Sequence, residues 1–160
     1  RGNVRFFIVG DGESRNQIEL LLENYKIGYT QNTAPNSLNP VCLASWVKNV
    51  DWVYAGSDIV CLTSFNEGTP VSIIESMASN TASICTNVGG VSDIIENGVD
   101  GIVSDSDSTK YSENLLNLIN NKDIRDKLAL NGQIKSLEKY NFNVLVKNIE
   151  LLYLTLINEK

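Results

Sequence analysis

Short apolar runs alternate with amphipathic helical patterns along most of this 160-residue chain. The runs that we interpret as strands are residues 4–9, 41–44, 58–62, 82–86 and 102–103. Helical spacing of apolar residues fills most intervals and continues from residue 111 through the last helix, whereas residues 28–40 have no period and are predicted to be a loop. Strands regularly separated by helices predict a Rossmann-like, doubly wound α/β domain with about five parallel strands and helices on both faces.

Composition excludes several classes of protein. The net charge of −6 argues against a nucleic-acid partner, and no apolar run approaches the roughly 18–20 residues of a membrane span. Histidine is absent, so the commonest general base and metal ligand are missing. Cys42, Cys61 and Cys85 lie in apolar runs without metal-ligand spacing, which predicts reduced, buried thiols in a cytoplasmic protein. The chain begins at Arg1 without Met or an apolar leader, and we expect it to belong to a longer chain.

Two carboxylates, Glu67 and Glu75, stand eight positions apart and flank the turn Gly68-Thr69-Pro70-Val71. Thr69 is a good N-cap and Pro70 suits the first helical position, so a helix is predicted to begin here. The free N–H groups and positive dipole end of a helix bind anions such as a diphosphate. Carboxylates on either side of a diphosphate can bind sugar hydroxyls, and this arrangement predicts a nucleotide-sugar site.

Each part of this hypothesis has a simpler alternative. Glu67 could belong only to the loop and Glu75 to a solvated helix face, although apolar neighbours place Glu75 at the edge of a buried face. Gly10 and Gly12 form either a phosphate-binding turn or merely a tight turn that requires positive φ. Trp46 either stacks on a base or only packs. Trp52 fits the core face of a helix and receives no function.

These residues resemble the donor-binding, C-terminal domain of group 1 retaining glycosyltransferases (glycosyltransferase family 4), one half of the GT-B fold. The matching segments stand in family order at residues 9–12, 54–60, 62–78, 87–93 and 97–101. The stretch from Glu67 to Glu75 is similar to the family's pair of glutamates separated by seven residues, the most specific of these matches. The resemblance implies that residues 1–160 are a nucleotide-sugar binding domain that is truncated at its N-terminus and lacks the acceptor-binding domain.

The resemblance also implies a role for each matching residue. Glu67 would bind hydroxyls of the donor sugar and stabilise charge at the anomeric centre, as the catalytic residue. Glu75 would bind the nucleotide ribose, and Gly68, Thr69, Pro70 and Val71 would face the sugar and diphosphate. Gly10 and Gly12 would let the backbone approach the donor, and Trp46 would flank the base.

The implied reaction moves a sugar from a UDP- or GDP-linked donor to a glycan or lipid-linked acceptor, with retention of configuration and without a metal or other cofactor. The acceptor would be bound through the missing N-terminal domain, so the fragment alone is expected to be inactive. The full-length protein could associate peripherally with the inner face of the membrane, and the fragment could self-associate through its final helix.

The sequence departs from the family pattern in two places that concern this site. Ser45 stands where the family usually has glycine, and Arg5 and Arg15 do not match the Arg and Lys that neutralise the diphosphate. Two alternatives therefore stay open: a nucleotide-sugar epimerase of GT-B architecture, and a non-catalytic nucleotide- or glycan-binding module.

Overall fold

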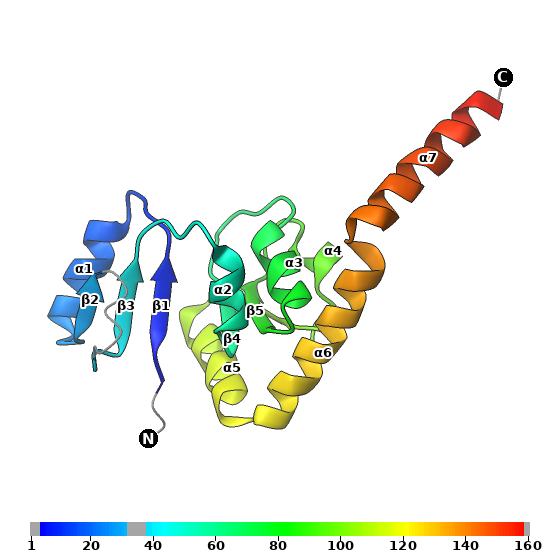
Figure 1. Ribbon diagram of the computed structural model, residues 1–160. Coiled ribbons are helices and arrows are strands. Elements are labelled where there is room, and N and C mark those ends of the chain that lie inside the picture. Colours follow the sequence, from blue (N-terminus) through cyan, green and yellow to red (C-terminus); the bar gives the residue numbers. More distant parts are fainter. Residues whose placement is uncertain (1–3, 32–37, 159–160) are drawn as a thin grey trace. The chain divides into compact units, whose positions relative to one another are not determined.

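The computed structural model describes residues 4–31 and 38–158 (Figure 1). The chain divides into two compact units, Arg1–Val50 and Asp51–Lys160, which are described here one at a time. We call them unit 1 and unit 2.

Unit 1 is a three-stranded parallel sheet with one helix. Its elements are β1 (Phe6–Val9), α1 (Arg15–Asn24), β2 (Tyr29–Gln31) and β3 (Val41–Ala44). The strand order is β1-β3-β2, so β3 is central, and all four of its residues are buried. Val41 of β3 aligns with Phe6 on one side and Tyr29 on the other.

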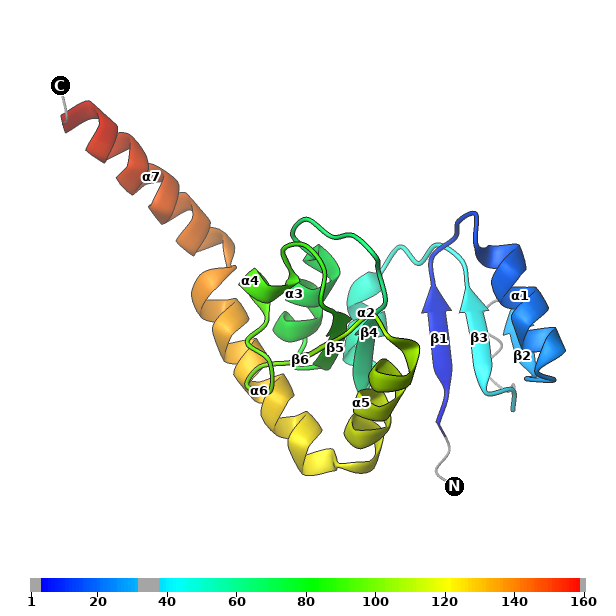
Figure 2. The same cartoon turned by 180° about the vertical axis from the view of Figure 1, so that it is seen from behind.

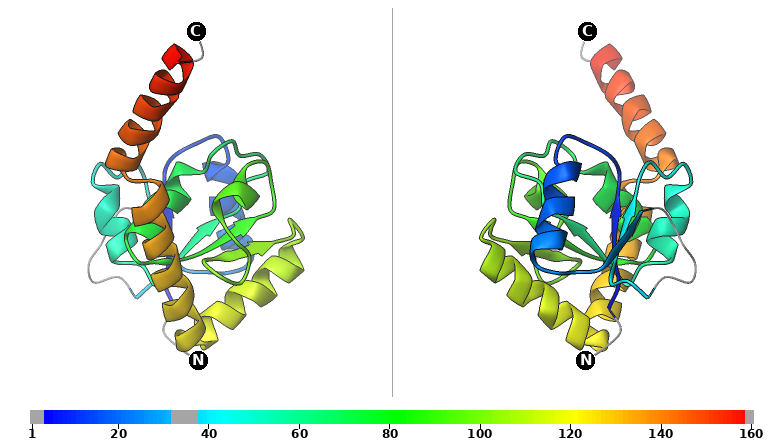
Figure 3. Two further views of the ribbon diagram at one scale, coloured as in Figure 1. Left: turned by 90° about the vertical axis from the view of Figure 1, so that its right-hand side faces the viewer. Right: turned by 90° about the vertical axis from the view of Figure 1, so that its left-hand side faces the viewer.

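Unit 2 contains a second parallel sheet and the remaining helices. Its strands are β4 (Ile59–Leu62), β5 (Ala82–Thr86) and β6 (Ile102–Ser104), in the order β4-β5-β6. Its helices are α2 (Val50–Ala55), α3 (Val71–Ala78), α4 (Val91–Ile94), α5 (Ser108–Asn120), α6 (Lys122–Lys139) and α7 (Phe142–Asn158). The last of these, α7, extends away from the rest of unit 2 (Figure 3). Among the described residues, no helix combines the length and hydropathy that a bilayer crossing requires.

Helices lie on both faces of the sheet of unit 2 (Figure 2), and buried residues form a core cluster on each face. Successive residues of a strand point to opposite faces, and Ile84 and Cys85 of β5 accordingly belong to different clusters. Cys85 packs with residues of α3 and α4, including Ile73, whereas Ile84 packs with α5 and α6, including Leu118. Helices therefore cover both faces, which confirms the predicted Rossmann-like α/β class with parallel strands.

Several local predictions differ from the structure. The described residues contain six strands in two sheets instead of about five in one, and β2 lies within the predicted loop 28–40, of which residues 32–37 are outside the described part. A three-residue strand is too short to show a periodic pattern, and it exists because Tyr29–Gln31 pairs with β3.

The run at residues 4–9 was predicted to be buried, but the side chains of β1, an edge strand of its sheet, are exposed. Trp52 is 73% exposed and Cys61 is exposed, so these two core predictions were also wrong. Cys42 and Cys85 are buried, as predicted.

A buried ion pair fastens the turn before β6 to α6. Asp100 and Lys135 approach to 2.6 Å, with side chains that are only 5% and 17% exposed. The Asp100 carboxylate also accepts a hydrogen bond from the backbone N–H of Glu96 at 2.8 Å. This carboxylate thus holds both its own turn and the neighbouring helix.

Asp100→Asn is expected to lower the free energy of unfolding by about 2 kcal/mol, because Lys135 loses its counter-ion but can still reach water. Urea unfolding of the purified chain measures this change. The control is Asp126→Asn, which breaks the exposed Lys122–Asp126 pair and should cost less than about 0.5 kcal/mol. Equal effects of the two substitutions would show that the Asp100–Lys135 pair has no special role.

Candidate functional site

The loop that carries Glu67 connects β4 to α3 and is fastened from one side by the end of β5. The Thr86 hydroxyl donates to the carbonyl of Ser64 at 2.5 Å. Further along, the N–H of Gly90 donates to the carbonyl of Glu67 at 3.2 Å. The Glu67 backbone is therefore held in place by the turn that follows β5.

Two glycines make this close approach possible. A Cβ atom added to Gly89 would lie 1.8 Å from the carbonyl oxygen of Glu67, and one added to Gly90 would lie 2.2 Å from that of Gly68. Gly89 also has a φ of +49°, a conformation that favours glycine. Both glycines lie in the segment 87–93 that matches the family, but no role was predicted for them. The signal in the sequence is the doubled glycine after a strand.

The start of α3 differs in detail from its prediction. Pro70, which is buried, occupies the N-cap position, so the prediction of Thr69 as N-cap was wrong. No side chain of the described residues makes a capping hydrogen bond to this helix. Pro70 was expected at the first helical position, but its ψ of 89° is not helical. The helix therefore begins at Val71, one residue later than expected. Since Ile73 N–H makes the first bond, to the Pro70 carbonyl at 3.0 Å, the N–H groups of Val71 and Ser72 precede the helical hydrogen bonds. The helix start therefore keeps the donors and dipole that suit an anion.

Glu75 lies one turn into α3 and is exposed. The prediction that it stands at the edge of a buried face was wrong, because Val71 on the same helical face is itself 60% exposed. The buried face of α3 is instead formed by Ile73, Ser76 and Met77. The Glu75 carboxylate accepts a hydrogen bond from the hydroxyl of Tyr54 at 2.9 Å, a contact that sequence reasoning missed.

The glycine turn of unit 1 follows β1. Gly10 has a φ of +117°, and its N–H points to the carbonyls of Ala44 and Ser45 at 3.0 and 3.2 Å. Gly10 and Gly12 line a depression of about 260 Å³ together with the other residues of 8–15, Ile18 and Leu43. Apart from the chain neighbours, no atom of the described residues lies within 4 Å of a Cβ added to either glycine, so the space beside the turn is open.

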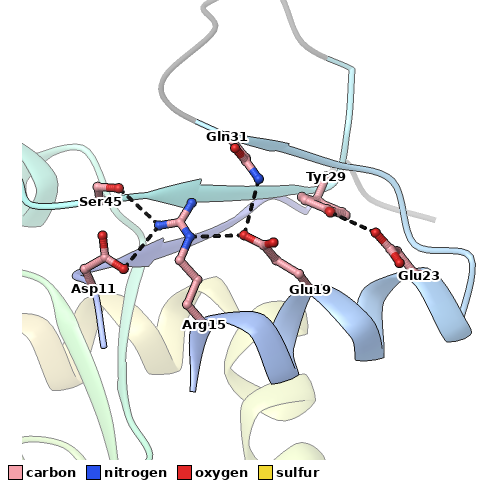
Figure 4. A network of polar contacts seen from close by, with 7 residues as sticks. All are labelled: Asp11, Arg15, Glu19, Glu23, Tyr29, Gln31 and Ser45. Carbon is pink, nitrogen blue, oxygen red and sulfur yellow. Dashed lines mark hydrogen bonds and ion pairs between the residues drawn. The ribbon is translucent and has the colours of Figure 1, made fainter. Parts of the chain in front are cut away.

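Arg15 borders the same depression and is already paired (Figure 4). Its guanidinium donates to Glu19 at 3.0 Å and to the Ser45 hydroxyl at 3.1 Å, and Asp11 lies 3.7 Å away. The two carboxylates balance this cation, and Glu13 adds further negative charge to the turn. The turn of unit 1 therefore offers backbone access without a surplus of positive charge.

The remaining candidate, Trp46, is 83% exposed. Its ring is exposed to solvent, so the alternative that Trp46 only packs is wrong.

The structure thus brings the predicted site residues together in two groups. Glu67, Gly68, Thr69, Pro70, Val71 and Glu75 lie on one loop–helix segment of unit 2. The other three residues lie in unit 1: Gly10 and Gly12 follow β1, and Trp46 follows β3.

Known proteins resemble this chain in sequence and in fold. The family described as Glycosyl transferases group 1 matches residues 1–135. The capsular polysaccharide biosynthesis glycosyltransferase CapM of Staphylococcus aureus is 28% identical over 158 residues, which are 98% of this chain and 39% of CapM. The UDP-Gal:alpha-D-GlcNAc-diphosphoundecaprenol alpha-1,3-galactosyltransferase of Escherichia coli is 24% identical over 155 residues, which are 97% of this chain and 38% of that protein.

Among solved structures, HepE of Anabaena in complex with UDP is similar at a TM-score of 0.75 and 19% identity, over 95% of this chain and 40% of HepE. This likeness shows the Rossmann-like fold of GT-B glycosyltransferases. The chain belongs to the group 1 glycosyltransferase family and corresponds to its C-terminal domain. It spans about two fifths of the length of the relatives that it matches.

Proposed function

We propose that the chain is the donor-binding domain of a retaining glycosyltransferase, which moves a sugar from a nucleoside-diphosphate sugar to a glycan or lipid-linked acceptor. The observation that carries the proposal is the placement of Glu67 and Glu75 on either side of the α3 N-terminus. The names of the relatives agree with it: CapM acts in capsular polysaccharide biosynthesis, and the Escherichia coli relative is named for a UDP-galactose donor and a diphosphoundecaprenol acceptor.

In this proposal, different residues of the segment from Glu67 to Glu75 bind different parts of the sugar donor. The Glu67 carboxylate accepts hydrogen bonds from the sugar hydroxyls and stabilises positive charge at the anomeric carbon. The bond from that carbon to the diphosphate breaks, and the diphosphate keeps the electron pair. The acceptor hydroxyl oxygen forms the new bond on the same face, and its proton passes to the departing diphosphate. Since the N–H groups at the start of α3 precede the helical hydrogen bonds, they can stabilise the negative charge of the leaving diphosphate without a metal.

The other residues bind the nucleotide. Glu75 accepts hydrogen bonds from the ribose, Trp46 flanks the base, and Gly10 and Gly12 let the backbone approach. Because Arg15 is balanced by Asp11 and Glu19, we do not assign it to the diphosphate.

The acceptor and the cellular setting follow from the same proposal. The acceptor binds to an N-terminal domain, so this domain alone binds donor without transferring sugar. The complete enzyme works in the cytoplasm and can act at the inner membrane face, where lipid-linked acceptors are reached. In isolation the domain can self-associate, because α7 exposes Leu145, Ile149, Leu152 and Leu156 on one helical stripe.

Titration of the ¹⁵N-labelled chain with UDP, GDP and their sugars tests the donor site. We expect the nucleotides to shift the backbone amide resonances of Gly10, Glu67, Val71 and Glu75 even when EDTA is present. The Kd should be near the millimolar range, which corresponds to a binding free energy of about −4 kcal/mol. UMP and GMP, which lack the second phosphate, should bind more weakly. Shifts elsewhere only, or none, would contradict the site, and binding that EDTA abolishes would contradict metal independence.

A further inference from the structure

Tyr54, on the last turn of α2, has no role in the proposed function. Its hydroxyl donates a hydrogen bond to Oε2 of Glu75 at 2.9 Å, across 21 positions of the chain. A tyrosine hydroxyl has a single proton to donate, and here that proton is directed to the carboxylate that we assign to the ribose.

The backbone of Tyr54 is fixed independently of this bond. The Thr81 hydroxyl donates to the Tyr54 carbonyl at 2.9 Å, and the N–H of Ser57 donates to the same carbonyl at 3.1 Å. Thr81 is only 4% exposed and lies just after α3, so it ties the end of α2 to the segment that follows α3. Tyr54 thus approaches Glu75 from an anchored position.

The anchored position of the Tyr54 hydroxyl, as a hydrogen-bond donor, matters because Glu75 is exposed. An exposed glutamate samples several rotamers, and restricting them costs free energy when a ligand binds. A hydrogen bond to Oε2 selects one orientation in advance and leaves Oε1 available for ligand hydroxyls.

We propose that Tyr54 is a positioning residue that holds the Glu75 carboxylate in the orientation that accepts the ribose hydroxyls of the donor nucleotide. This inference rests on the proposed function, which assigns Glu75 to the ribose. Partial burial, together with the hydrogen bond to Glu75 and the charge of that carboxylate, raises the pKa of Tyr54 to about 12. The hydroxyl consequently stays protonated and able to donate at neutral pH.

The simpler interpretation is that the bond only joins α2 to α3. The two interpretations differ in what Tyr54→Phe changes, since phenylalanine keeps the ring and removes only the hydroxyl. A structural link affects stability regardless of ligand, whereas a positioning bond affects affinity only when both Glu75 and the ribose hydroxyls are present.

The test compares Tyr54→Phe, Glu75→Gln and the double variant with the unchanged 160-residue chain. Tyr153→Phe serves as the matched control, since Tyr153 is a 63% exposed tyrosine on α7. UDP and 2′,3′-dideoxyuridine diphosphate are titrated by NMR, and Tm is measured for each variant.

We expect Tyr54→Phe to weaken UDP binding by about three- to tenfold, which corresponds to the net contribution of one typical hydrogen bond. The loss should vanish with the dideoxy nucleotide and in the Glu75→Gln background. Tm should change by less than about 4 °C, and Tyr153→Phe should bind as the unchanged chain does.

Each other outcome overturns the inference. If Glu75→Gln weakens UDP binding but Tyr54→Phe does not, or if the loss persists in the Glu75→Gln background, the positioning role fails while the proposed function stands. If the unchanged chain binds neither UDP nor GDP, the proposed function fails and the inference fails with it.

Discussion

Gly89→Ala is expected to destabilise unit 2 by about 3 kcal/mol or more, at the upper end of the range for overpacking combined with backbone strain. The added Cβ would lie 1.8 Å from the carbonyl oxygen of Glu67, so the turn and the Glu67 loop cannot both keep their positions. Chemical denaturation measures the stability. The ¹⁵N–¹H spectrum should show the largest shifts between Ser64 and Val71, because this loop is held by the same turn.

Gly98→Ala separates the collision from the strain of a left-handed backbone. Gly98 has a φ of +77°, but within the described part of the chain no atom beyond its sequence neighbours lies within 4 Å of a Cβ added there. We expect this substitution to cost about 1 kcal/mol, the cost of a non-glycine residue in a left-handed conformation. Similar losses for Gly89→Ala and Gly98→Ala would mean that contact with the Glu67 loop contributes nothing.

Glu67→Ala is expected to lower kcat of the complete glycosyltransferase by about 10²–10³-fold, the range for losing one electrostatic contact to a transition state. In our proposal Glu67 faces charge that develops only as the sugar–diphosphate bond breaks. Glu75→Ala should instead raise the KM for the donor by about tenfold with a smaller change in kcat, because the ribose is bound in both ground and transition states.

Steady-state kinetics with varied donor and saturating acceptor distinguish these two effects. Glu138→Ala is the control, since Glu138 is an exposed glutamate on α6 and should leave both constants unchanged. A larger loss of kcat for Glu75→Ala than for Glu67→Ala would reverse the division of roles and contradict the proposal.

Much of the fold could be predicted from the sequence because buried strands of a parallel sheet are continuous apolar runs. The predicted strands at residues 41–44 and 82–86 coincide with β3 and β5, the central strands of their sheets. Edge elements were harder to predict. The short strand β2 exists through its pairing with β3, and the exposure of β1 depends on its position in the sheet, which no local pattern encodes.

In the candidate site, too, local features could be predicted from the sequence and tertiary contacts could not. The spacing of Glu67 and Glu75 and the Pro70 that opens α3 are local features, so the sequence was sufficient to place a helix start between the two carboxylates. Whether a given carboxylate is buried depends on how the helix rotates against its sheet. The apolar neighbours of Glu75 suggested a partly buried position, yet α3 turns Ile73 and Met77 inward and leaves Glu75 exposed.

The sequence by itself determined the parallel α/β class, the family and the paired carboxylates, because these follow from hydrophobic periodicity and from motifs of neighbouring residues. Only the tertiary structure decided which distant groups support the motif. Gly89 and Gly90 hold the Glu67 loop from the turn after β5, and Tyr54 reaches Glu75 from α2. Such contacts join residues about 20 positions apart, and they arise from the crossing of helices and strands in space, which a pattern of neighbouring residues does not record.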